Sequence, residues 1–424
     1  MSHRTLAAAL LASLTATSAA TAQDVTLDVL YCNPSFSRYY DPIANAFMEQ
    51  NPDITIEYRA PCSNYDEGHQ TVLRSAVTGD LPYLFFSGFH LLEELAETLD
   101  ARDAIVDLEP LLEAEGEDFV SANFDPAVLS LGEISGTQFG LAFNASTPIV
   151  YFNRELVERA GGDPDAMPDT WGAMIELAAE INALGENIEG ISYDVHAWPD
   201  SWAFQAMINQ QGGDLLNDSR DDVAFDNEIG LRTMETFRSF VTEGGMSTID
   251  RDQAIQLFAA GQVGITVQTP ARVASLTDMV GDAFELGTAT FPIDDKETGG
   301  VPTGGNAAVI LSHEEAVRDA AWAFVRFMTG PEAQAIVVEE SGYMPVNLRA
   351  LEEGYLDDFY AANPNFRTVA TQMDRARPWE GYPGGESVRI WREQRDVIGE
   401  VMRGTLSPEE GLDQIVDTTR RLMN

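Results

Sequence analysis

Positive charge is scarce in this chain. The 424 residues include 25 Lys and Arg against 69 Asp and Glu, which gives a formal net charge of −44, and Lys296 is the single lysine. A nucleic-acid partner is excluded, because phosphate binding needs a basic face. We interpret the acidity as a heavily solvated surface suited to a salty environment. The other interpretation, attraction of cationic ligands, has no local acidic cluster to support it.

Cysteine is almost absent as well. The two residues, Cys32 and Cys62, provide too few ligands for a metal cage without nearby histidines, so a metal site is the weaker interpretation. An exported cysteine pair usually closes a disulfide, and we expect one here. Such a bond would contribute about 3 to 4 kcal/mol by the chain-entropy model.

Beyond the N-terminal segment the chain has no long apolar run. No later segment approaches the roughly 18 apolar residues that a membrane span needs. The N-terminus itself has a positive charge at Arg4, an apolar stretch over 6–14 and the small residues Ala20-Thr21-Ala22. This pattern predicts a signal peptide over 1–22 and a mature chain beginning near Gln23. No cysteine follows the cleavage site to carry a lipid, so we expect a free periplasmic protein.

Catalytic motifs are also missing. The sequence has no H-E-x-x-H spacing, G-x-S-x-G elbow, Walker loop or dinucleotide fingerprint, and Gly304-Gly305 is too short to bind phosphate. Acidic residues are so frequent that a glycosidase-like carboxylate pair would be hidden among surface acids. A binding protein without a cofactor is therefore favoured, and a secreted glycan-active hydrolase remains the alternative from another class.

The chain is too long for one compact core, so we expect two lobes. Alternating apolar residues predict strands at 25–29 and 54–58, with a helix over 42–50 between them. The stretch "LPYLFFSGF", 81–89, predicts a third buried strand with Gly88 opening a loop at its end. The strand-helix-strand order favours a parallel sheet covered by helices.

Two later segments have strong helical patterns. "PDTWGAMIELAAEINALG", 168–185, places Trp171 on an apolar stripe after an N-cap at Thr170 or Asp169. "EEAVRDAAWAFVRFMTGPEAQAIV", 314–337, predicts two helices separated at Gly330-Pro331. We assign Trp171 and Trp322 to the core.

Aromatic residues gather near the predicted strand ends and loops. A flat ring can stack on the apolar face of a sugar, while ordinary packing is at least as good an explanation for any single ring. These residues are Tyr39, Tyr40, Tyr65, Phe85, Phe86, Phe89, Trp198, Trp202, Tyr343, Trp379 and Tyr382.

Several stretches, in this order from about residue 25 to the end, resemble the extracellular solute-binding proteins of ATP-driven importers. The similarity is to the carbohydrate-binding type, and most closely to its glycerol phosphate-binding members. The stretches are "GLAFNASTPIVYFNRELVERAG", "MPDTW", "NQQGGDLL", "LFAAGQVGIT", "AAWAFVRFMTGPEAQ", "SGYMPV" and "GTLSPEEGLDQIVD".

The resemblance implies an α/β fold of the type II periplasmic binding protein class, with two lobes that each contain a mostly parallel sheet flanked by helices. Residues 143–147 then form the first crossing between the lobes, where small polar side chains leave room for a ligand. The implied boundaries are a signal peptide at 1–22, an N-terminal lobe at 23–145 plus 292–341, and a C-terminal lobe at 146–291 plus 342–424.

The resemblance also implies ligand-binding positions. Tyr65, Ser146, Gly305 and Tyr343 match positions where the family contacts its ligand, and Trp198 lines up with a tryptophan of the cleft. To these we add Trp379 as a loop aromatic.

Three positions depart from the family pattern. Phe89, or His90 beside it, replaces a glutamate that holds glycerol hydroxyls, and Thr269 or Pro270 replaces a serine. Pro383 stands where the family has a phosphate-binding arginine, the residue that holds phosphate most strongly. Arg272 is the candidate to compensate for that loss, although an arginine on a loop more often faces solvent.

These departures favour a neutral ligand, such as a sugar, an oligosaccharide or a glycosylated polyol. Glycerol 3-phosphate or a related phosphodiester is the alternative within the same family. The resemblance implies a monomer that closes on one ligand and delivers it to an inner-membrane permease.

Overall fold

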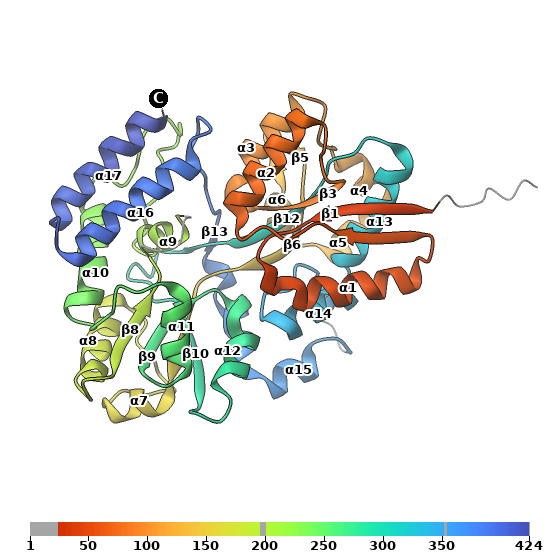
Figure 1. The fold of residues 1–424 in the computed structure, drawn as a ribbon. Helices are drawn as coiled ribbons and strands as arrows, with labels where there is room; N and C mark the ends of the chain where they lie inside the picture. The colour runs from red at the N-terminus through yellow and green to blue at the C-terminus, as the bar shows by residue number, and fades with distance from the viewer. Residues whose placement is uncertain (1–23, 196–200, 352–353, 424) are drawn as a thin grey trace, which may run out of the picture.

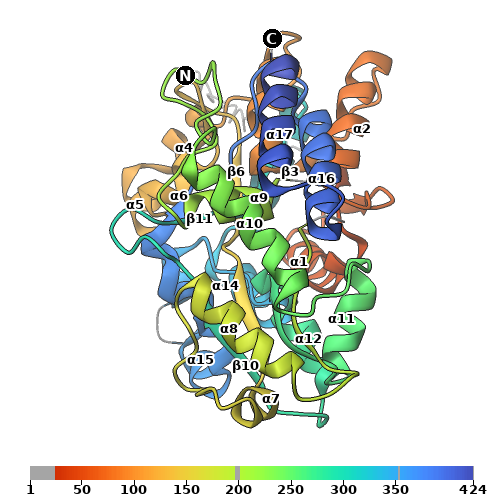
Figure 2. The same cartoon turned by 90° about the vertical axis from the view of Figure 1, so that its left-hand side faces the viewer.

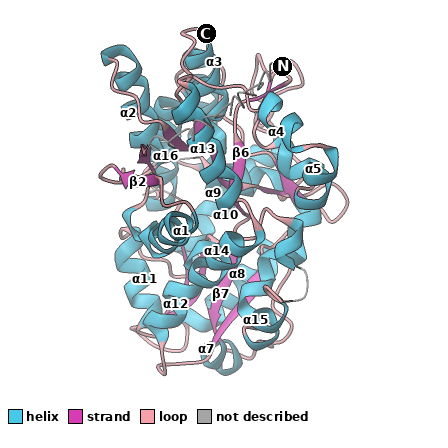
Figure 3. Cartoon of the chain, turned by 90° about the vertical axis from the view of Figure 1, so that its right-hand side faces the viewer, coloured by secondary structure: helices cyan, strands magenta, loops and turns pink. Residues whose placement is uncertain are grey.

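The computed structural model describes residues 24–195, 201–351 and 354–423, so the expected signal peptide lies outside the described residues. Within these ranges no helix is both long and apolar enough to span a membrane. The chain forms two lobes side by side, each with a sheet inside and helices around it (Figure 1). Figure 3 shows the same arrangement by secondary structure.

The first sheet has the strand order β2-β1-β3-β12-β6. Its strands are β1 (Val25–Leu30), β2 (Ile54–Tyr58), β3 (Leu84–Gly88), β6 (Leu141–Ser146) and β12 (Gly304–Ile310). Strand β1 runs parallel to β2 and β3, whereas β12 is antiparallel to β3 and β6. The surrounding elements are α1 (Ser37–Gln50), α2 (Tyr65–Thr78), α3 (Phe89–Asp100), α4 (Glu109–Glu115), α5 (Glu117–Asn123), α6 (Pro126–Ser130), β4 (Glu133–Ile134), β5 (Thr137–Gln138), α13 (Glu315–Met328) and α14 (Pro331–Ser341).

The second sheet has the order β10-β7-β9-β8, with β7 (Ile149–Asn153), β8 (Glu189–Tyr193), β9 (Val263–Gln268) and β10 (Leu286–Thr290). Its helices are α7 (Arg154–Arg159), α8 (Trp171–Asn182), α9 (Trp202–Asn209), α10 (Glu228–Thr242), α11 (Arg251–Ala259), α12 (Val273–Val280), α15 (Asp357–Ala362), α16 (Ser387–Arg403) and α17 (Pro408–Met423). The last two pack against each other and against α10 (Figure 2). Short pieces complete the chain: η1 (Pro34–Phe36), η2 (Pro270–Arg272), η3 (Leu348–Leu351), η4 (Pro364–Arg375), β11 (Val301–Pro302) and β13 (Ala376–Arg377).

The chain passes between the lobes where β6 ends and β7 begins. Thr147 and Pro148 connect the two strands, and both are held by the amide nitrogen Nε2 of Gln372, which donates to Thr147 Oγ1 at 2.6 Å and to the Pro148 carbonyl at 2.7 Å. On the return path, Lys296 forms an ion pair with the Asp169 carboxylate at 2.9 Å and donates to the Asp169 carbonyl at 2.7 Å. This lysine therefore fixes the loop after β10 to the start of α8 in the second lobe.

The helical patterns in the sequence are confirmed. Helix α8 begins at Trp171 after Thr170 and buries the expected stripe, and α14 begins at Pro331 after Gly330. Trp171 and Trp322 are both buried, at 1% and 7% exposure.

Three expectations differ from the structure. The loop expected after Gly88 is absent, because Gly88 is the N-cap of α3, which starts directly at Phe89. Helix α1 begins at Ser37, earlier than expected, because the preceding 3-10 turn leads straight into it and Pro42 is accommodated near its start. Over the described residues neither sheet is mostly parallel, because strands that run between the lobes are antiparallel to their neighbours. In the first sheet β12 is antiparallel to β3 and β6, and in the second the one parallel pair is β8 with β9.

Candidate functional site

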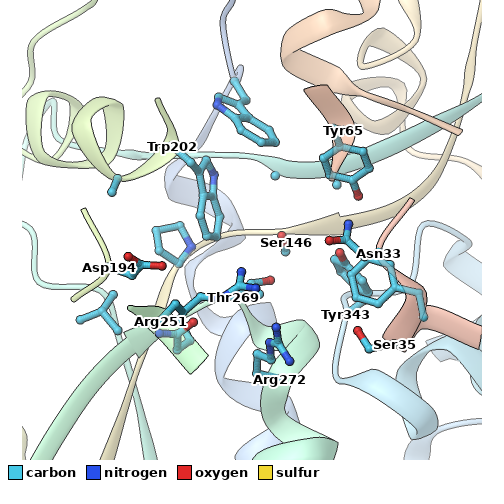
Figure 4. A pocket seen from close by; sticks show the side chains of 18 of the residues that line it. Asn33, Ser35, Tyr65, Ser146, Asp194, Trp202, Arg251, Thr269, Arg272 and Tyr343 are labelled. Atoms are coloured by element: carbon cyan, nitrogen blue, oxygen red, sulfur yellow. The ribbon is translucent and has the colours of Figure 1, made fainter. Parts of the chain in front are cut away.

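A cleft lies between the two lobes and encloses about 890 Å³ of empty space, including the part that is open to solvent. Figure 4 shows its walls from close by. Its described lining residues are Asn33, Ser35, Phe36, Tyr65, Ser146, Pro148, Tyr193, Asp194, Trp202, Ala203, Arg251, Val267, Gln268, Thr269, Arg272, Gly304, Gly305, Tyr343 and Trp379. Both sheets contribute at the ends of strands, where backbone groups and loop side chains are accessible to a ligand.

Polar side chains form the wall of the first lobe. Asn33 follows β1 with a positive φ of 65°, a conformation that asparagine tolerates better than most residues. Tyr65 opens α2 after the N-cap Asn64, and its hydroxyl accepts a hydrogen bond from Asn306 at 3.1 Å. Burial, with the neighbouring Tyr65, raises the pKa of Tyr343 well above its usual value. Tyr343 therefore stays neutral and can offer its hydroxyl group to a ligand.

The floor of the cleft consists of backbone. Gly305 in β12 pairs with Ala145 in β6 and has a φ of 126°, which side-chain-bearing residues rarely adopt. A Cβ atom here would lie 2.2 Å from the Asn144 carbonyl oxygen. Ser146 pairs with Gly304 on the neighbouring position. The glycine lets the two crossing strands approach closely and leaves backbone exposed to the cleft.

Two tryptophans form an aromatic wall. The ring of Trp202 projects into the cleft (Figure 4), and its Nε1–H donates to the Pro302 carbonyl at 3.2 Å, which fixes its orientation. The ring centre of Trp379 lies 6.0 Å from that of Trp202. On its other side Trp379 stacks on His90 with 3.5 Å between ring centres. Such a surface is suited to the apolar face of a sugar or polyol.

The second lobe contributes charged groups. Arg272, which ends η2, points into the cleft. Asp194 and Arg251 lie next to each other, to the left of Arg272 in the close-up view (Figure 4). Burial lowers the pKa of the Arg272 guanidinium, and the positive charge of Arg251 lowers it further. The guanidinium remains charged, because arginine stays protonated at any ordinary pH.

Seven of the nine positions expected to bind ligand line this cleft: Tyr65, Ser146, Thr269, Arg272, Gly305, Tyr343 and Trp379. Phe89 does not line it, because its ring is buried in the core beneath α3. His90, the other candidate for that position, stacks behind Trp379. Trp198 lies outside the described residues. Placement in the cleft is a finding, while a role in binding stays a prediction for each residue.

Sequence reasoning missed other lining residues, including Asn33, Asp194, Trp202 and Arg251. Trp202 had been singled out as an aromatic near a loop but not placed in the site. Asn33 and Asp194 follow the strands β1 and β8 closely, and positions just beyond strand ends are the signal that would have found them. Arg251 starts a surface helix and has no such signal.

The two cysteines face each other just before the cleft wall. Their backbones pair as an isolated parallel β-bridge, in which the Asn33 amide donates to the Cys62 carbonyl at 2.7 Å. The structure has both thiols free, so the expected disulfide is not formed in it. The thiols make a hydrogen bond instead, which raises the pKa of Cys32 and lowers the pKa of Cys62.

A buried carboxylate lies directly behind Tyr65. Asp66 is 3% exposed, and its nearest ion-pair partner, Arg392, is 3.9 Å away. Burial raises the pKa of Asp66 to about 6, and the positive charge of Arg392 opposes the shift only in part.

We predict that Asp66 makes the protein less stable as the pH rises. Its pKa is higher in the folded chain than in the unfolded chain, so the folded state binds more protons between about pH 4 and pH 6. The stability from this group is present below that window and is lost across it. Asp66→Asn should therefore raise the free energy of unfolding at pH 7 by up to about 3 kcal/mol and change it little at pH 4.

Urea unfolding of both proteins between pH 4 and pH 7 measures this difference. Asp53→Asn, at an exposed position on the turn between α1 and β2, is the matched control and should leave the pH dependence unchanged. An unaltered pH slope in Asp66→Asn would contradict the prediction.

Asp194 is the one carboxylate among the described lining residues of the cleft, whereas glycoside hydrolysis needs two. No group of three or more His, Cys, Asp or Glu residues suited to a metal ion occurs in the described part of the chain.

Comparison with known proteins gives the following relationships. A model of the bacterial extracellular solute-binding protein family matches residues 42–368. The sn-glycerol-3-phosphate-binding periplasmic protein UgpB of Escherichia coli K12 is 24% identical over 396 residues, which cover 90% of this chain and 89% of the relative.

Two solved structures share the fold. UgpB from Mycobacterium tuberculosis, in complex with glycerophosphocholine, has a TM-score of 0.82 at 19% identity, covering 94% of this chain and 98% of that one. The GacH receptor of Streptomyces glaucescens, solved unliganded and with acarbose, has a TM-score of 0.77 at 20% identity with the same coverage. These likenesses confirm the expected two-lobed α/β architecture.

Proposed function

The chain belongs to the bacterial extracellular solute-binding protein family, and we propose that it captures a polyhydroxylated solute for an ATP-driven importer. The solute class is a sugar, an oligosaccharide or a glycosylated polyol. The observation that carries this proposal is the aromatic wall of Trp202 and Trp379 opposite the polar wall around Tyr65. Flat rings on one side and hydrogen-bonding groups on the other match the two faces of a sugar ring.

The mechanism is closure of the two lobes around one ligand. Residues from both lobes line the cleft, so a bound solute makes its full set of contacts only when the lobes come together. Closure excludes water and strengthens each buried hydrogen bond. The closed protein then docks on a membrane permease, and transport is driven by the ATPase subunits of that permease.

The named relatives support a second candidate within the same mechanism. UgpB proteins are named for sn-glycerol 3-phosphate, so this compound or a related phosphodiester is an alternative solute. Arg272 supports this alternative, because it is a cationic residue in the lining of the cleft. The hydrolase alternative has less support, since the described lining residues include a single carboxylate.

Native mass spectrometry of the protein purified gently from its own periplasm tests the proposal. We expect a bound mass that corresponds to one sugar, glycoside or glycerol derivative, recovered unchanged after incubation. Release of a hydrolysis product would support the enzyme instead. A protein that carries no small molecule and gains no thermal stability from such solutes would contradict a binding role.

Other expectations follow from the same family membership. We propose that residues 1–22 are removed on export, that the protein acts in the periplasm as a monomer, and that it catalyses no reaction. The proposed lobes are 23–145 plus 292–341 and 146–291 plus 342–424. Strand β6 ends at Ser146, one residue beyond the first boundary, and Lys296, within 292–341, pairs with Asp169 of the second lobe.

We also propose that Cys32 and Cys62 are bonded in the exported protein, because they already face each other and the compartment is oxidising. The bond would then contribute about 3 to 4 kcal/mol to the free energy of unfolding. Alkylation of the denatured protein checks this: both thiols should be labelled only after reduction. Labelling without reduction would contradict the bond.

A further inference from the structure

The cleft reverses the charge balance of the protein. Acidic residues outnumber basic ones by 69 to 25 in the whole chain. The described lining of the cleft nevertheless includes two arginines, Arg251 and Arg272, and one acid, Asp194. Removing arginine from water is costly unless an anion accompanies it, so an excess of arginine at a half-buried site needs a physical reason.

Arg272 has no anionic partner of its own. Across the described residues its guanidinium forms no ion pair within 4 Å and no hydrogen bond. Its backbone is bonded at both ends: the amide donates to the Thr269 carbonyl at 3.1 Å, and the carbonyl accepts from Ser275 Oγ at 3.1 Å. Burial and the nearby Arg251 lower the pKa of its guanidinium, and the carboxylate of Asp252 opposes this shift only in part. Arg251 differs, because its Nε lies 3.6 Å from Asp252. Asp252 pairs directly with Arg251, so among the described residues Arg272 is the cleft arginine without an ion-pair partner of its own.

Two further donors in the cleft lack acceptors. The amide nitrogen Nε2 of Gln268 and the indole Nε1–H of Trp379 are buried and have no hydrogen-bond partner in the described structure. Their residues are 7% and 6% exposed, so water reaches them poorly. An unpaired buried donor costs about 1 to 3 kcal/mol, a cost that a ligand with acceptor atoms would remove. Two lining residues thus have buried donors that an anionic ligand could satisfy, in addition to the charge of Arg272.

We propose that the solute carries one anionic group, a carboxylate or a phosphate ester, which binds Arg272 on the second lobe. This inference rests on the proposed function and specifies its substrate class as an anionic polyhydroxylated compound. The hydroxylated part of the solute lies against Trp202 and Trp379. The anion would therefore bind at Arg272 and not at position 383, where this chain has a proline instead of the family's arginine.

A neutral solute in the same cleft would leave the charge of Arg272 unpaired once the lobes close and water leaves. An anion would instead form charge-assisted hydrogen bonds with the planar guanidinium, in the bidentate geometry that suits carboxylates and phosphates. The site therefore discriminates by penalising the neutral analogue as well as by attracting the anion. The acidic surface does not prevent approach, because its field is screened beyond about 8 Å at physiological salt.

Isothermal titration calorimetry with matched probes tests this. The probes are D-glucuronate against D-glucose for the carboxylate, and sn-glycerol 3-phosphate against glycerol for the phosphate, added to the full mature protein. We expect at least one anionic probe to bind about tenfold to a hundredfold more tightly than its neutral twin. The pair that shows the preference identifies which anion the site selects.

Three variants localise the effect. Arg272→Gln should abolish the preference, and Arg272→Lys should keep part of it, because a lysine retains the charge without the planar fork. Arg403→Gln, at an exposed position on the last turn of α16, removes the same charge far from the lining and should keep the preference. Unchanged melting temperatures show that the variants fold.

Equal binding of the neutral twins, or a preference that survives Arg272→Gln, would overturn the inference and leave the proposed function standing. Failure of both anionic probes to bind at millimolar concentration would also overturn it. The proposed function fails by a different result, namely a protein that retains no solute in native mass spectrometry.

Discussion

Replacing Gly305 by alanine is expected to lower the free energy of unfolding by about 3 kcal/mol. Its φ of 126° is strained for any residue with a side chain. The new Cβ would also lie 2.2 Å from the Asn144 carbonyl oxygen in β6, an atom of the neighbouring backbone that cannot rotate away. The two crossing strands would have to separate. Urea unfolding measures the loss, and the affinity for the solute should fall as well because the floor of the cleft moves.

Gly79→Ala is the matched control. Gly79 also has a positive φ, 76°, but no atom lies within 4 Å of the Cβ position. Alanine there should cost about 1 kcal/mol through backbone conformation alone. Equal losses in the two variants would show that close approach of β6 and β12 does not matter at Gly305.

Replacing Trp202 by alanine should weaken solute binding by about thirtyfold, corresponding to about 2 kcal/mol. The ring is half-buried and held over the cleft by its bond to Pro302, so the solute loses a fixed stacking surface. Native mass spectrometry after periplasmic purification should show a much smaller fraction of the protein carrying its solute. The fold should survive, since the ring lies at the cleft wall.

Trp202→Phe keeps a ring without the indole N–H and separates stacking from orientation. We expect it to retain most of the solute that Trp202→Ala loses. If alanine at this position retained the solute as well as the original tryptophan does, the aromatic wall would not contribute to binding.

The sequence predicted the fold well because each of its signals was local and strong. The stripe of α8, the Gly330-Pro331 break and the alternation in β1 each depend on residues close together in the chain. Strand direction in the second sheet could not be predicted in the same way. It depends on how the chain crosses between lobes, which is a property of long-range connections.

The family resemblance named Tyr65, Ser146 and Gly305, and all three line the cleft, while their roles in binding stay predictions. Phe89 was wrongly placed there, because helix α3 begins at once after β3 and turns that ring into the core. Arg251 was missed for the opposite reason: it begins an ordinary surface helix, and only tertiary packing brings it beside Arg272.

The single lysine gives the protein a built-in reporter of its own motion. Lys296 is half-exposed and fixed to the second lobe by Asp169. The proposed removal of residues 1–22 would leave one other primary amine, the new N-terminus, which precedes β1 of the first lobe in the sequence. An α-amino group loses its proton at lower pH than a lysine side chain, so two dyes can be attached in turn. Energy transfer between them would then follow opening and closing in the unaltered polypeptide.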